Sequence, residues 1–305
     1  MGRRTRDLSL LFAVSLVVRL LAIVPVQHPG YMDAAYSYDI ALNLARGEGW
    51  VEPFLWNYLD NPTGIPHPSH LYWMPMPTIV AWVGLAILGQ SYRAAQVPFA
   101  LLSALLPLVS YWVAVETTGR RRDGWLAGLL TVFSGFYVLY WGHTDNFALF
   151  ALAGSLSLVA AWQASKAREK RGRALTWSLA AGALVGLAHL SRADGLLLLV
   201  AIALAWATSL ISDLRSCKTE EIRDWRLEIA SFFFVILGYT LMMLPWFVRN
   251  WTVSGELLPA AGAQTIWMTT YNDLFSYGHE LSPQTYLAWG WANILRSKLH
   301  ALWLN

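Results

Sequence analysis

Long apolar runs separated by short polar connections dominate the pattern along this chain of 305 residues. Each run approaches the length of about 20 residues that an α-helix needs to cross the hydrocarbon core of a bilayer. The pattern therefore predicts an all-α polytopic membrane protein with about seven transmembrane helices. These spans are expected at residues 8–26, 94–115, 124–141, 146–164, 174–190, 195–212 and 229–247.

The longest polar interruption runs from Gly30 to Pro77 and is rich in aspartate, histidine, proline and aromatic residues. Loops held by a rigid scaffold are where binding and catalytic residues concentrate. We therefore interpret this loop as half of an active site that faces out of the membrane. Residues 34–45 within it are predicted to form a short amphipathic helix at the outer surface, capped by Asp33 and ended by Gly47.

An eighth apolar segment, 71–89, determines the orientation of everything that follows it. If this segment does not span and the N-terminus is cytoplasmic, most lysines and arginines fall on the cytoplasmic side, as membrane proteins prefer. If it spans, most of them fall outside. Pro75 and Pro77 also argue against a span, because each removes a backbone donor that lipid cannot replace. We therefore expect the active site on the extracytoplasmic face of the cell (plasma) membrane.

Composition agrees with a membrane protein, since 56% of residues are hydrophobic, 13% are charged and the mean hydropathy is +0.41. Soluble domains carry about 25% charged residues. The net charge of +3 and the pI near 9 do not indicate a nucleic-acid partner, because the basic residues lie in short loops between apolar runs. The single cysteine, Cys217, excludes an internal disulfide and is expected on the cytoplasmic side.

Two aspartates adjoin predicted spans on the outer side: Asp33 follows the first span, and Asp145 precedes the fourth. A carboxylate at a membrane surface can act as a general base or bind a divalent cation. Helix N-capping is the alternative for both, because aspartate suits that position before an apolar run.

Three arginines are candidates for binding a phosphate. Arg192 and Arg249 follow predicted spans on the outer side, where a guanidinium can bind a lipid phosphate with two hydrogen bonds. A snorkelling side chain is the alternative for either, and Arg192 also has Asp194 as a local partner. Arg19 lies deep in the first span and needs a partner, either an acid of the loop or a substrate phosphate.

His67 and His70 have the spacing of a metal-binding pair on a helix, but Pro66 and Pro68 disfavour a helix there. We expect a role in packing the loop rather than a zinc site. Asp39 is the reserve candidate for a functional acid. The residues expected to line the loop side of the site are Tyr36, Asp39, His67, His70 and Tyr72.

The order of these motifs resembles the GT-C class of membrane glycosyltransferases. Asp33-Ala34-Ala35-Tyr36, leading to the segment Ile40–Gly47, resembles the first outer loop of the dolichyl-phosphate-mannose protein mannosyltransferase-like group, which includes bacterial aminoarabinose transferases. The later signatures of this group resemble residues 66–77, 88–98, 190–195 and 244–250.

The resemblance implies a seven-span module, here residues 1–250 with its first outer loop at 28–93, and an outer tail at 251–305. It implies transfer of a sugar from a polyprenyl-phosphate donor, with inversion, to an acceptor on the outer face. Asp33 would match the base that activates the acceptor hydroxyl and Asp145 the supporting acid of the second outer loop. Arg192 and Arg249 would be candidates for the donor phosphate. Some members use a divalent cation, which Asp33 and Asp145 would hold here.

Two departures from the family pattern keep other functions open. Ala34 stands where the family usually has a glutamate, and members continue with further spans beyond the equivalent of this chain. The resemblance therefore implies an N-terminal part of a longer protein, and a degenerate member without activity is one alternative. A transporter or a lipid-binding membrane protein is the other, although transporters place polar residues at mid-membrane and here only Arg19 lies deep.

Overall fold

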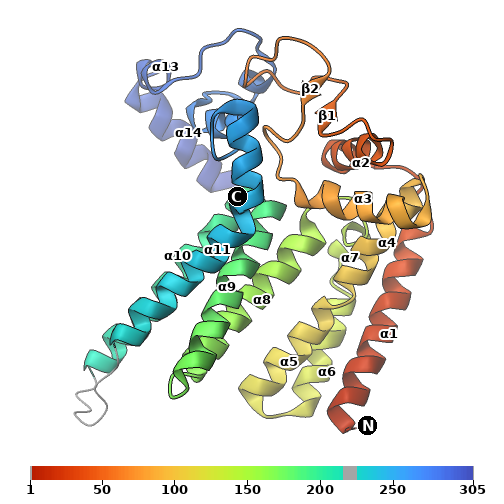
Figure 1. Cartoon of the computed structure of the whole chain (residues 1–305), viewed down its shortest axis with the longest axis vertical. Coiled ribbons are helices and arrows are strands. Elements are labelled where there is room, and N and C mark those ends of the chain that lie inside the picture. The colour runs from red at the N-terminus through yellow and green to blue at the C-terminus, as the bar shows by residue number, and fades with distance from the viewer. Residues whose placement is uncertain (1, 216–224, 305) are drawn as a thin grey trace. The chain divides into compact units, whose positions relative to one another are not determined.

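The computed structural model describes residues 2–215 and 225–304, and the side chains of residues 209–225 lie outside that description. The chain is mostly helical, and it divides into two compact units (Figure 1). The first unit holds residues Met1–Gly47 and Met74–Pro245, and the second holds Glu48–Trp73 and Trp246–Asn305. The module boundary expected near residue 250 stays a prediction. Cys217 and most of the basic loop around it lie outside the described residues.

The first unit contains the longer helices. Their bounds are α1 (Arg3–Ile23), α2 (Met32–Ala45), α3 (Met76–Leu88), α4 (Tyr92–Ser103), α5 (Leu106–Thr118), α6 (Arg121–Val132), α7 (Tyr137–Tyr140), α8 (Phe147–Lys166), α9 (Arg171–Ser191), the 3-10 helix η1 (Ala193–Leu196), α10 (Leu197–Arg215) and the start of α11 (Trp225–Ser254).

The second unit contains shorter elements. These are the end of α11, the strands β1 (Val51–Glu52) and β2 (His67–Pro68), α12 (Ala260–Gln264), the 3-10 helices η2 (Thr265–Trp267) and η3 (Tyr271–Phe275), α13 (Pro283–Ala288) and α14 (Trp291–Leu304). The strands pair antiparallel, with Val51 opposite Pro68 and Glu52 opposite His67. A small core of this unit contains Leu59, Leu71, Ala261 and Leu274.

The predicted all-α membrane fold is confirmed. Within the described residues, four helical stretches are long and apolar enough to cross a bilayer: Tyr92–Thr118 (α4 with α5), Phe147–Lys166, Arg171–Ser191 and Arg226–Ser254. Each overlaps one of the seven spans predicted from the sequence. The total number of spans stays a prediction.

The prediction of one continuous span at 124–141 is wrong. Helix α6 ends at Val132, the chain turns at Gly135 with φ 61°, and the single turn of α7 follows. The helix ends where its C-cap, Phe133, leaves the helical region with φ −101° and ψ 54°. Gly135 then supplies the positive φ of the turn into α7, which glycine adopts at little steric cost. The last carbonyls of α6 are therefore available to other groups.

The segment 71–89 forms α3, which has only 13 residues. At 1.5 Å per residue it is about 20 Å long, short of the roughly 30 Å of a hydrocarbon core. Its prolines fit a helix start, because Pro75 is the N-cap and Pro77 lies in the first turn, where the missing donor is not needed. This length agrees with the expectation that the segment does not span.

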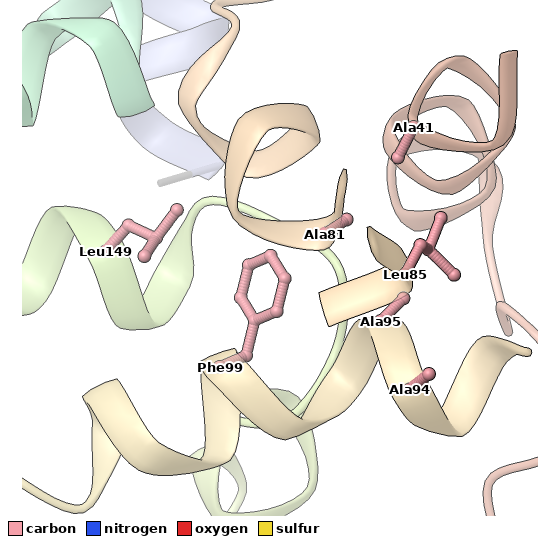
Figure 2. Close-up of a cluster of buried hydrophobic side chains, with 7 residues drawn as sticks. All are labelled: Ala41, Ala81, Leu85, Ala94, Ala95, Phe99 and Leu149. Carbon is pink, nitrogen blue, oxygen red and sulfur yellow. The ribbon is translucent and has the colours of Figure 1, made fainter. Parts of the chain in front are cut away.

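Helices α2, α3, α4 and α8 meet in a core of small and large apolar residues (Figure 2). Phe99 of α4 is fully buried and extends from its helix toward Ala81 of α3. Leu85 of α3 points toward Ala41 of α2. This packing fixes α2, and with it Asp33, on the rest of the first unit.

Helices α9 and α11 approach closely through two glycines. A Cβ at Gly182 would lie 1.8 Å from the carbonyl oxygen of Val235, and one at Gly238 would lie 2.1 Å from that of Leu179. Small residues of this kind allow backbone contact between membrane helices, where no hydrophobic force draws them together. His189 and Tyr239 add a 2.8 Å hydrogen bond between the same helices.

Candidate active site

A hydrogen bond joins the start of α2 to the connection before α8. The Thr144 hydroxyl donates to the carbonyl oxygen of Ala34 at 2.7 Å, and the Thr144 side chain is fully buried. Asp33 and Asp145 each lie next to one end of this bond in the sequence. The structure thus brings together the two aspartates that the sequence singled out, although they are more than a hundred positions apart.

Asp145 is held by two donors. The Tyr31 hydroxyl donates to Oδ2 at 2.8 Å, and the backbone N–H of Asn146 donates to Oδ1 at 2.6 Å. Asp145 is only 4% exposed, and this burial raises its pKa. The two hydrogen bonds and the charge of Arg192 oppose the rise, because each stabilises the carboxylate.

Asp33 lies in the first turn of α2 and is half-buried. Burial raises the pKa of Asp33 to about 6, and the negative charge of Asp145 contributes to the rise. A carboxyl with a pKa near neutrality is suited to general base catalysis, because it is ionised at neutral pH yet takes up a proton readily. Perturbed carboxyls of this kind are typical of functional sites.

Neither aspartate is the N-cap of the adjacent helix. The N-cap of α2 is Tyr31, and that of α8 is Asn146. The predicted capping of the helix at 34–45 by Asp33 is therefore wrong, because this helix, α2, already begins at Met32. Asp33 therefore does not cap α2, whereas Asp145 still accepts a backbone N–H at the start of α8 through its Oδ1.

Aromatic and imidazole rings surround the aspartates. The rings of Tyr31 and His143 meet edge to face with centroids 5.4 Å apart, and Tyr140 packs against both. The Tyr92 hydroxyl lies 3.2 Å from Nδ1 of His143. Burial lowers the pKa of His143, so its ring is neutral at neutral pH.

Arg192 follows α9 and reaches the same group of residues electrostatically. Its guanidinium donates two 2.9 Å hydrogen bonds to Asp194 and lies 5.4 Å from the Phe150 ring. The charge of Arg192 also acts on the pKa of Asp145. The pair with Asp194 that the sequence suggests is present. Arg192 still acts on the charge of Asp145 while it is paired in this way.

Arg19 lies elsewhere and is fully buried. It donates to the carbonyl oxygens of Thr131 and Val132 at 3.1 Å, and its guanidinium lies 5.7 Å from the Trp141 ring. Its partners are thus the end of α6 and an aromatic ring. A loop acid is not among these partners, and a role of Arg19 toward a substrate phosphate stays a prediction.

Of the residues predicted to line the loop side of the site, His67, His70 and Tyr72 lie in the second unit. Tyr36 and Asp39 lie in the first unit. His67 pairs with Asp60 at 2.8 Å. His70 is fully buried, and burial lowers its pKa to about 3. Tyr72 packs edge to face on Trp56. These contacts fit the expected packing role of the histidines. In the first unit, Tyr36 is 4% exposed, whereas Asp39 is exposed.

Arg249 also belongs to the second unit. Its Nη2 donates to the carbonyl oxygen of Ser69, its Nη1 donates to Asn250 at 3.1 Å, and its guanidinium stacks 4.9 Å from the Trp246 ring. Its predicted role toward a donor phosphate stays a prediction.

The site offers few ligands for a divalent cation. In the described part of the chain no three residues of the types His, Cys, Asp and Glu come together as metal ligands. Both oxygens of Asp145 accept hydrogen bonds. Ca²⁺ and Mg²⁺ take six or more oxygen ligands, so these side chains do not fit a cation held by the protein alone.

Several residues of this site were missed by sequence reasoning. Each of them forms a hydrogen bond to a distant part of the chain. The bonds join Tyr31 to Asp145, Tyr92 to His143, and Thr144 to Ala34. The available signal was that Tyr31 and His143 each lie two positions before a candidate aspartate.

The helical membrane architecture is that of a GT-C-type module. Residues 66–237 match the sequence profile of the dolichyl-phosphate-mannose-protein mannosyltransferase family, and the chain belongs to this family.

Curated relatives are similar over most of this chain. An undecaprenyl phosphate-alpha-4-amino-4-deoxy-L-arabinose arabinosyl transferase of Pseudomonas aeruginosa (strain LESB58) is 26% identical over 250 residues, which cover 81% of this chain and 40% of the relative. The protein of the same description from Pseudomonas paraeruginosa is 26% identical over 231 residues, 74% of this chain and 38% of the relative. The chain thus spans about two fifths of the length of these relatives.

Solved structures show the same fold at low identity. The Archaeoglobus fulgidus oligosaccharyltransferase in its apo form superposes with a TM-score of 0.58 and 15% identity, over 97% of this chain and 33% of that one. The archaeal oligosaccharyltransferase in complex with an inhibitory peptide and a dolichol-phosphate gives a TM-score of 0.58 and 14% identity, over 100% of this chain and 38% of that one.

Proposed function

We propose that this protein transfers a sugar from a polyprenyl-phosphate donor to an acceptor, with Asp33 as the general base. The observation that carries the proposal is the Asp33 carboxyl, whose pKa is raised to about 6 next to a second buried aspartate. The family, and relatives whose descriptions name undecaprenyl phosphate-linked aminoarabinose, support the donor class. Membrane lipids are the expected surroundings, and the kind of sugar and acceptor stays open.

In the proposed reaction the acceptor hydroxyl attacks the anomeric carbon of the sugar while the bond from that carbon to the phosphate oxygen breaks. Asp33 accepts the hydroxyl proton, and the polyprenyl phosphate leaves with the bonding electron pair. A single displacement of this kind inverts the anomeric centre. A guanidinium near the leaving phosphate, for which Arg192 is the candidate in the first unit, stabilises the developing negative charge.

Asp145 supports the base in this scheme. Its negative charge contributes to the raised pKa of Asp33, and its own position is fixed by Tyr31 and the Asn146 backbone. Asp145 is therefore proposed as a positioning and electrostatic group rather than a second base. Its burial leaves little room for direct contact with an acceptor.

The proposed reaction takes place on the extracytoplasmic face. The support is the distribution of basic residues, which concentrate in connections on the opposite side from Asp33 and Asp145. Labelling of Cys217 by a membrane-impermeant maleimide in intact cells would contradict this orientation.

The test is release of undecaprenyl phosphate by the purified chain, supplied with a panel of undecaprenyl-phosphate pentoses and hexoses and with membrane extract as acceptor. Asp33→Asn is expected to lower the rate by about a hundredfold or more, the usual contribution of a general base. Glu48→Gln removes an exposed acid of the same loop and serves as the matched control, with an unchanged rate. Equal rates for Asp33→Asn and wild type would remove the base assignment. Failure of the wild-type chain with every donor would favour a lipid-binding protein without catalysis.

A further inference from the structure

A groove runs between α5, α8 and α9 at the end of α8 that is remote from Asp145. Its volume is about 520 Å³, within the range of small-molecule sites, roughly 300–1,000 Å³. The apolar part of the wall contains Trp112, Leu156, Val159, Trp177 and Leu184. All five side chains are half-buried, so they line an opening rather than a sealed core.

The groove has a charged part and an apolar part. Arg173 lies at one end and Leu184 at the other, on the same helix α9. Their separation of eleven positions corresponds to about 16 Å along the helix axis. An occupant therefore extends from the helix end well into the hydrocarbon layer.

A polar hollow of about 230 Å³ adjoins the charged end of the groove and shares Gln163 and Arg173 with it. Lys166 and Lys170 line this hollow together with Glu169. The side chains of Lys170 and Arg173 form no hydrogen bond or ion pair with any residue that the structure describes. Positive charge in the hollow thus exceeds negative charge.

The one acid on the groove wall is already neutralised. Glu116 accepts hydrogen bonds from Arg4 at 3.3 Å and lies 3.7 Å from the Lys166 ammonium group. That ammonium also lies 3.9 Å from the Trp162 ring. Glu116 therefore does not repel an anion bound at Arg173.

We propose that this groove binds an anionic phospholipid, with the phosphate at Lys170 and Arg173 and one acyl chain against Val159 and Leu184. The arrangement follows the amphipathic form of a phospholipid, because a basic polar hollow opens directly into an apolar groove. Basic residues at a membrane surface bind anionic lipids with about 1 kcal/mol each. A neutral phospholipid gains the apolar contacts but not the charge.

The groove is separate from the proposed sugar-transfer site. Helix α8 has 20 residues between the Asp145 end and Lys166, which is about 30 Å. A polyprenyl-phosphate donor reacting beside Asp33 cannot place its phosphate at Arg173. This distance favours a resident phospholipid over the donor carrier, and the binding does not depend on the proposed reaction.

Native mass spectrometry of the purified full chain in detergent, titrated with phosphatidylglycerol or phosphatidylcholine, tests the proposal. The wild-type protein is expected to bind phosphatidylglycerol several times more tightly than phosphatidylcholine. Arg173→Ala is expected to weaken phosphatidylglycerol binding about fivefold and to leave phosphatidylcholine binding unchanged. Arg171→Ala is the matched control, since it removes another exposed arginine, two positions away, that does not line the groove or the hollow.

Val159→Phe narrows the apolar part without removing charge and is expected to weaken binding of both lipids. Equal effects of Arg173→Ala and Arg171→Ala, or an unchanged affinity in Val159→Phe, would overturn the proposal. Displacement of phosphatidylglycerol by undecaprenyl phosphate at equal concentration would overturn it as well, by assigning the groove to the donor carrier.

Discussion

The Tyr31 hydroxyl donates a 2.8 Å hydrogen bond to Asp145 Oδ2, across 114 positions of sequence. Tyr31 precedes α2, which carries Asp33, and Asp145 precedes α8, so this bond ties together the two segments that carry the candidate acids. A donor to a buried carboxylate stabilises its charged form and fixes its position. The bond therefore controls both where the negative charge next to Asp33 lies and how firmly it is kept ionised.

Tyr31→Phe is expected to lower the rate of sugar transfer about tenfold, since a hydrogen bond to a charged group contributes about 1.5 kcal/mol. Loss of the donor raises the pKa of Asp145. The pH at which the transfer rate falls off on the acidic side is therefore expected to shift. A purely structural defect would lower the rate without shifting this pH. Tyr140→Phe is the matched control, because Tyr140 packs on Tyr31 through its ring. Equal profiles for Tyr31→Phe and wild type would exclude this role.

The pH dependence of transfer is a direct consequence of the Asp33 environment. With a pKa of about 6, Asp33 is protonated and inactive as a base below that pH, so the rate is expected to fall as pH decreases through about 6. Asp145→Asn removes a neighbouring negative charge and is expected to move this acidic limb to lower pH. The limb is expected to stay above the ordinary aspartate range, because burial is the larger cause of the shift. A limb that moves to higher pH in Asp145→Asn would contradict the assignment.

The sequence predicted the architecture well because the membrane imposes it. Runs near the required length identified α4 with α5, α8, α9 and α11, since an unpaired backbone in lipid excludes almost everything except helices. Sequence periodicity could not reveal the break after α6. That break depends on Gly135 and on Arg19, which satisfies the freed carbonyls from another helix.

The candidate site was predicted in part. The places of Asp33, Asp145 and Arg192 next to apolar runs point to all three. In the structure the charge of Asp145 acts on Asp33, and that of Arg192 acts on Asp145. Tyr31 and His143 were missed because their roles depend on tertiary contacts, which one sequence does not encode as a local pattern.

Arg192 is the phosphate candidate whose local pairing can be tested directly. Arg192→Gln is expected to weaken binding of an undecaprenyl-phosphate sugar about tenfold, the effect of losing one charge-assisted contact. In the wild-type structure the Asp194 carboxylate accepts two 2.9 Å hydrogen bonds from Arg192. Asp194→Asn removes this competing charge and is expected to strengthen binding of the undecaprenyl-phosphate sugar. Titration followed by quenching of tryptophan fluorescence measures both. Unchanged affinity in Arg192→Gln would exclude the arginine from the donor site.

Arg19 is expected to stabilise the helix bundle rather than to take part in transfer. Its two 3.1 Å hydrogen bonds satisfy carbonyls at the end of α6, and an unsatisfied buried polar group costs about 1–3 kcal/mol. Arg19→Met is therefore expected to lower the thermal midpoint of the purified protein by several degrees. Affinity of the folded protein for the donor is expected to stay unchanged.

Ser15 provides the control for this prediction, since it is fully buried on the same helix and its hydroxyl has no hydrogen-bond partner in the described structure. Ser15→Ala is expected to leave the thermal midpoint unchanged or to raise it, because it removes an unpaired polar group from the interior. If Arg19→Met instead keeps the thermal midpoint of wild type and loses donor binding, Arg19 acts on the phosphate after all. The carbonyls of Thr131 and Val132 would then be its partners only while no donor is bound.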